Sequence, residues 1–134
     1  MGKSSTLDAG YFDGYVSFSG VLRNWLIAYG IGGPVLFITQ TEVTKKLADS
    51  GQSLSIALLF LAGVFLQVLV ALLYKGAMWY LYVGEVDPEK RNTRRYAISD
   101  WLSEAFWLEL LFDLGTIALF LIATFRVLMI LAVK

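Results

Sequence analysis

Three polar side chains interrupt apolar stretches of the sequence, where a charge or an amide is costly and therefore informative. Glu109 and Asp113 stand one helical turn apart among Phe, Trp and Leu residues, so both carboxylates share one face of a helix. Such a pair can attract cations, relay protons or coordinate a metal, or it can form the acidic membrane-surface face of a long helix. Gln67 lies in another apolar stretch. Its amide could line a pore, or it could form a hydrogen bond between helices.

Arg126 is the sharpest polar feature, because no other charged residue occurs between positions 114 and 133. A mid-membrane Arg costs about 2.5–3.5 kcal/mol on insertion scales. An inward-facing side chain would need a partner, such as another subunit or the carbonyl of Gly30, which Pro34 deprives of its helical donor. The alternative is a side chain that snorkels to the headgroups. We expect Arg126 and Gln67 to shape a membrane path or an inter-helix contact.

A compact basic cluster occurs at Lys90, Arg91, Arg94 and Arg95. Its simplest interpretation is a cytoplasmic anchor that contacts anionic membrane lipid. It could instead bind a phosphate-bearing ligand, such as a nucleotide signal, or an acidic partner. The net charge is zero, and no aromatic residue beyond Tyr96 is interleaved with the cluster, so specific binding of duplex nucleic acid is not expected.

Small residues and a proline interrupt the first apolar stretch. Gly30, Gly32, Gly33 and Pro34 predict a helix that is kinked at Gly32-Gly33-Pro34. Ala28 and Gly32 form a small-xxx-small pair, which would allow close packing of another helix.

Several kinds of chemistry have no support in the sequence. The chain has no His and no Cys, so it lacks the commonest general base and the commonest ligands of zinc and haem. It also lacks a phosphate-binding Gly-rich loop, a zinc motif and a nucleophile elbow. We therefore expect no enzyme activity, no cofactor and no metal site.

The elements that must position these residues are membrane helices. Of 134 residues, 57% are hydrophobic and 16% are charged, and the mean hydropathy is +0.65. A small water-soluble domain could not form its polar shell from this composition. The sequence predicts an all-α integral membrane protein with about three transmembrane helices, in a symmetric helical oligomer that buries the polar groups between protomers.

The expected order is a polar N-terminal segment at 1–15, a kinked first span at 16–43, a loop at 44–53, a second span with an aromatic interfacial end at 54–83, a basic cytoplasmic segment at 84–98, and a long helix containing the third span at 99–134. Basic residues set the orientation. They favour the side that holds the N-terminus and residues 84–98, which predicts a cytoplasmic N-terminus and an external C-terminus.

Two functions fit this pattern. The first is an oligomeric membrane channel or membrane-permeabilising protein, with a carboxylate ring at its inner mouth and an anionic ligand or lipid that regulates it through the basic segment. Small multi-pass effectors of bacterial antiviral systems have this general architecture, but no motif here carries a specific resemblance. The second is a non-catalytic accessory or assembly subunit of a larger membrane complex, in which the polar groups pair with other membrane subunits.

Overall fold

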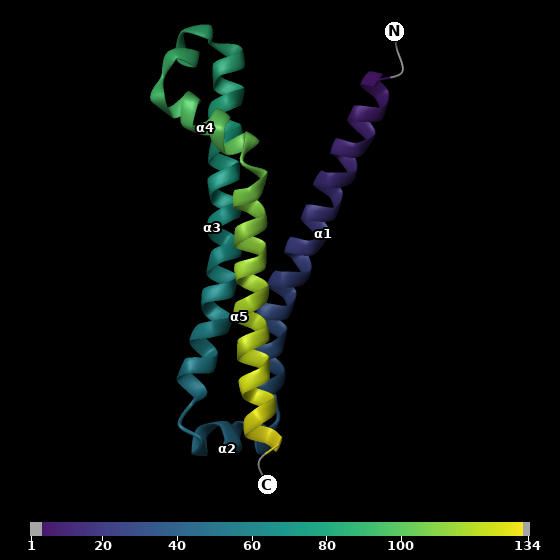
Figure 1. The fold of residues 1–134 in the computed structure, drawn as a ribbon. Helices are drawn as coiled ribbons and strands as arrows, with labels where there is room; N and C mark the ends of the chain where they lie inside the picture. Colours follow the sequence, from purple (N-terminus) through teal and green to yellow (C-terminus); the bar gives the residue numbers. More distant parts are fainter. Residues whose placement is uncertain (1–3, 133–134) are drawn as a thin grey trace.

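Three long helices dominate the computed structural model, which describes residues 4–132, with side chains from residue 13 onward (Figure 1). The elements in chain order are α1 (Ser4–Thr39), α2 (Thr41–Asp49), α3 (Ser53–Val86), the 3₁₀ helix η1 (Pro88–Asn92), α4 (Arg94–Glu104) and α5 (Phe106–Ala132). No strand occurs within residues 4–132, so the predicted all-α class is confirmed.

Three helical segments are long and apolar enough to cross a membrane: Asp13–Thr39, Ser53–Val86 and Phe106–Ala132. At 1.5 Å per residue the 34 residues of α3 extend about 51 Å, well beyond a hydrocarbon layer of about 30 Å. One end of α3 therefore projects from the layer. The outer surfaces of the long helices carry many exposed Leu, Ile, Val, Phe and Trp side chains, as a lipid environment requires. The chain is an integral membrane protein.

The helices α3 and α5 form the tightest pair in the bundle. Their buried residues recur at spacings of four and three, which is the pattern of a left-handed helix pair. On α3 these residues are Ile56, Phe60, Gly63, Gln67, Val70, Ala77 and Gly84. On α5 they are Glu109, Asp113, Thr116, Phe120, Ala123 and Val127. The buried polar residues of this seam thus all lie in its α4-side half, and the α2-side half is apolar.

The helix α1 lies against this pair near the α2 end and leans away from it toward the α4 end (Figure 1). Pro34 lies inside α1 without interrupting it. Among the small residues that the sequence singled out, Gly30 makes the close contact, and the pair Ala28 and Gly32 does not. A side chain at Gly30 would collide with Val64 and Phe120, whereas Ala28 is exposed and Gly32 has open space around its Cα.

Two further segments differ from the expected order. The predicted loop at 44–53 overlaps α2, and the turn between α2 and α3 contains Gly51, whose φ of 67° is a left-handed conformation that suits glycine. The predicted polar segment at 1–15 is helical from Ser4 onward, because α1 begins there and continues into the candidate span Asp13–Thr39. Residues 1–3 lie outside the described part of the chain.

The predicted continuous helix at 99–134 is divided. Its first part is α4, which begins earlier, with the Thr93 hydroxyl accepting a hydrogen bond from the backbone amide of Tyr96. Ala105 then leaves the helical conformation, with φ −82° and ψ 60°, and α5 starts after it. The Ala105 carbonyl accepts two hydrogen bonds, one from the Leu108 backbone amide at 3.0 Å and one from the Tyr74 hydroxyl at 3.2 Å. No Gly or Pro marks this position in the sequence.

Candidate functional site

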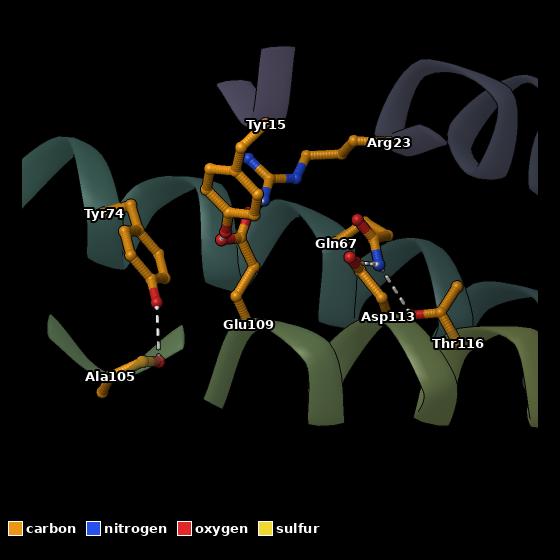
Figure 2. Close-up of polar contacts among 8 residues, drawn as sticks. All are labelled: Tyr15, Arg23, Gln67, Tyr74, Ala105, Glu109, Asp113 and Thr116. Atoms are coloured by element: carbon orange, nitrogen blue, oxygen red, sulfur yellow. Dashed lines mark hydrogen bonds and ion pairs between the residues drawn. The ribbon is translucent and has the colours of Figure 1, made fainter. Parts of the chain in front are cut away.

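Glu109 on α5 is the centre of a polar cluster between the helices. Its carboxylate accepts a hydrogen bond from the Tyr15 hydroxyl and forms an ion pair with the Arg23 guanidinium, and both partners come from α1 (Figure 2). The Arg23 and Glu109 side chains are 21% and 11% exposed. The ion pair is therefore largely withdrawn from the surroundings, and it joins the part of α1 that leans away to the rest of the bundle.

A second polar group lies one turn further along α5. The Gln67 amide of α3 donates to Asp113 at 2.9 Å and to the Thr116 hydroxyl at 3.0 Å (Figure 2). The Thr116 hydroxyl lies 2.9 Å from the Phe112 carbonyl, to which it can donate. All three side chains are buried. Gln67, Glu109 and Asp113 thus face the interior of a single chain.

Two buried atoms in this region have no hydrogen-bond partner among the described residues: Nε of Arg23 and Oε1 of Gln67. An unpaired buried polar atom is unfavourable by about 1–3 kcal/mol. Both atoms lie in the polar half of the bundle, so this half retains capacity to bind water, an ion or another polar group.

Grooves lie on both sides of the point where α1 meets Glu109. One, of about 420 Å³, is lined mainly by α1 and α5 and includes Trp25, Leu110 and Asp113. The other, of about 550 Å³, includes Arg23, Tyr74 and Ser103. Tyr15 and Glu109 line both grooves, so the α1–α5 polar contact separates them.

An aromatic layer closes the bundle beyond Thr116. Phe60 and Phe120 are 2% and 3% exposed, and their ring centroids lie 5.7 Å apart. Tyr29 packs on both rings, and its hydroxyl lies 2.6 Å from the Thr124 hydroxyl. Below this layer the seam is apolar. Within one chain, the polar groups therefore reach only part of the way along the span.

Arg126 lies apart from these groups, on an exposed face of α5. Its guanidinium donates to the Ser55 hydroxyl at 2.9 Å, near the start of α3. The hydrogen bond that the sequence suggested to the Gly30 carbonyl is not the one observed. In the protomer the side chain lies near the end of the span, as a snorkelling arginine does.

The four residues of the basic cluster make different contacts in the structure. Nε of Arg91 donates to the Gly84 carbonyl at 2.9 Å. Lys90 forms an exposed ion pair with Asp87 at 3.3 Å, and the Arg95 guanidinium lies 5.9 Å from the centroid of the Tyr80 ring. Arg94 is exposed. The four basic residues thus do not form one uniform surface.

Sequence reasoning missed Arg23, Tyr15 and Thr116 as partners of the polar positions. A usable signal was present for Arg23, because a basic residue near one end of the first span faces a carboxylate near the same end of the third. Among residues 13–132, no group of three or more acidic side chains is placed to hold a metal ion.

Comparison of the chain with protein-family models, with curated proteins and with solved structures finds no match. The function must therefore be argued from the site itself.

Proposed function

We propose that this protein is a membrane channel or membrane-permeabilising protein that acts as a homo-oligomer, and that α1 is its moving element. The observation that carries the proposal is the uneven attachment of α1. Near α2 it is held by apolar packing against Phe60 and Phe120, whereas toward α4 it leans away and is held by polar contacts to Glu109.

The ion pair between Arg23 and Glu109 acts as a latch in this mechanism. Apolar packing in a membrane is not driven by exclusion of water, because lipid tails are as apolar as the side chains. A charge pair, in contrast, is strongly favoured over two separated charges at this depth. Its rupture would free α1 and join the two grooves beside Glu109.

Conduction would require more than one chain or displacement of α1, because the aromatic layer closes the single protomer. The carboxylates of Glu109 and Asp113 would then attract cations to the polar half of the path. We further propose that the N-terminus and the basic segment at 84–98 face the cytoplasm, in agreement with the excess of basic residues at that end.

The test is ion flux through liposomes that contain the purified protein. An Arg23→Gln variant weakens the latch and leaves both carboxylates in place, and a loss of about 1.4 kcal/mol is enough to raise the open fraction and the flux about tenfold. Arg94→Gln is the matched control, since it removes the same charge from an exposed position on α4. Equal flux through wild type and a well-folded Arg23→Gln variant would exclude the latch.

A second function, that of an accessory subunit in a larger membrane complex, is favoured by one observation. The ionisable groups at membrane depth on α5 that face inward are paired within the chain, so they do not require a second copy of it. Native mass measurement in detergent separates the two functions. A closed ring of identical chains supports the channel, whereas a monomer supports the accessory subunit.

A further inference from the structure

The projecting end of α3 and the η1–α4 segment enclose a groove of about 460 Å³ outside the polar cluster described above. Its walls combine aromatic and basic side chains. They are Trp79, Tyr80, Val83, Lys90, Thr93 and Arg95. The two cations lie at its rim as exposed side chains, and Arg95 is oriented over the Tyr80 ring by a cation–π contact.

Arg91 holds this groove in shape rather than lining it. Its hydrogen bond to the Gly84 carbonyl ties η1 to the end of α3. Any side chain at position 84 would collide with the Tyr96 ring, so α4 packs directly on the α3 backbone at this glycine. The groove is therefore a built feature of the α3–α4 hairpin.

A second, larger groove of about 720 Å³ continues from the first along α3. The two grooves share Trp79 and Tyr80, and the second adds Leu72, Lys75 and Met78. Lys75 lies 22 residues after the start of α3, about 33 Å along the helix, which matches the far boundary of a hydrocarbon layer of about 30 Å. The basic groove thus lies at headgroup level, and the apolar groove descends from it into the membrane.

We propose that Lys90 and Arg95 bind the phosphate of an anionic phospholipid, whose acyl chain follows the groove past Trp79 and Leu72. A free nucleotide offers the same phosphate chemistry, but it has nothing to place in an apolar groove that leads into the bilayer. A phospholipid can occupy both grooves at once, with its phosphate in the basic groove and its acyl chain in the apolar one. This site is separate from the Glu109 latch, and its occupancy can be measured whether or not the protein conducts ions.

The experiment uses Trp79 as a reporter. In a full-length variant with Trp25→Phe, Trp101→Phe and Trp107→Phe, Trp79 is the remaining tryptophan. The protein is placed in bilayers of zwitterionic lipid that contain a minor fraction of lipid brominated on its acyl chains, and quenching by brominated phosphatidylglycerol is compared with quenching by brominated phosphatidylcholine. We expect the anionic lipid to quench more strongly at the same fraction.

The test variant is Arg95→Gln, which removes a charge from the groove. Its matched control is Arg94→Gln, which removes the same charge from the neighbouring position outside the groove. Arg95→Gln should reduce the preference for anionic lipid roughly five-fold, and Arg94→Gln should leave most of it. Co-purified lipid, identified by native mass spectrometry of otherwise wild-type chains carrying the same single substitutions, gives a second measurement that does not depend on the tryptophan replacements.

Three results would overturn the proposal. Equal quenching by the two lipids would show that the groove has no preference for a phosphate-bearing anion. Equal losses in Arg94→Gln and Arg95→Gln would show diffuse surface charge instead of a site. Displacement of the brominated lipid by micromolar ATP would assign the groove to a soluble nucleotide.

Discussion

Arg23 and Glu109, which are 86 residues apart in the sequence, form an ion pair between the first and last long helices of the bundle. Tyr15 adds a hydrogen bond to the same carboxylate. These contacts join α5 to the part of α1 that leans away from it.

A double-mutant cycle measures this coupling. Removal of one partner from a buried pair destabilises a protein by about 3–5 kcal/mol, and the partial exposure of both side chains places Arg23→Gln and Glu109→Gln near the lower end of that range. The double variant should be more stable than the sum of the two losses predicts, by about 1 kcal/mol or more. Denaturant unfolding in detergent micelles gives the free energies, and strictly additive losses would contradict the pairing.

Gly63 provides a test of the helix pair α3–α5. A Cβ at this position would collide with the Phe120 ring, which is buried and cannot move aside without disturbing Phe60. We expect Gly63→Ala to lower the free energy of unfolding by about 1–3 kcal/mol. Gly76→Ala, on the same helix, meets no atom within 4 Å and should be neutral or slightly stabilising. Equal changes in the free energy of unfolding for both variants would mean that α3 and α5 do not pack closely at Gly63.

The amide of Gln67 is expected to contribute through hydrogen bonds to Asp113 and Thr116. Gln67→Leu removes the donor to both, and interhelical hydrogen bonds in membrane proteins average about 0.6 kcal/mol each, so a loss of about 1–2 kcal/mol is expected. Thr116→Val removes one of the two bonds and should cost less than Gln67→Leu. Thermal unfolding of the purified variants provides the comparison, and a stabilised Gln67→Leu protein would show that the hydrogen bonds only compensate for burial of the amide.

Substitution of Arg126 should have different effects in an isolated chain and in an oligomer. In the protomer it contacts Ser55 on an exposed face, so Arg126→Ala should change the stability of an isolated chain by less than about 1 kcal/mol. If copies of the chain meet on this face, the same substitution should shift the mass of the native particle and alter ion flux about tenfold. A particle of unchanged mass with unchanged flux would remove Arg126 from the proposed mechanism.

Apolar length and composition predicted the helical class and the three candidate spans, because a 20-residue apolar run has few alternatives. The same signals could not predict the break at Ala105. At this break the Ala105 carbonyl accepts a hydrogen bond from the Tyr74 hydroxyl of another helix, and no local residue type encodes such a contact. The proline in α1 does not end the helix, and such a proline is tolerated in a membrane helix where neighbouring helices support it.

The polar positions were recognisable by type, but their partners were not. Gln67, Glu109 and Asp113 stand out because they interrupt apolar runs. Their partners depend on how the helices are rotated about their axes, which is fixed by the stripe of small residues and rings at Gly30, Gly63 and Phe120. Burial of the carboxylates within the chain follows from that rotation.

The order of the two latch residues along the chain has a consequence for biogenesis. A ribosome releases α1, with Arg23 ten residues into its candidate span, long before it synthesises Glu109. Until α5 emerges, the arginine has no counter-charge, and α1 is the least apolar of the three candidate spans. Stable integration of the first helix therefore waits for the last, and a nascent chain truncated before residue 109 should leave its N-terminal helix open to extraction from the bilayer.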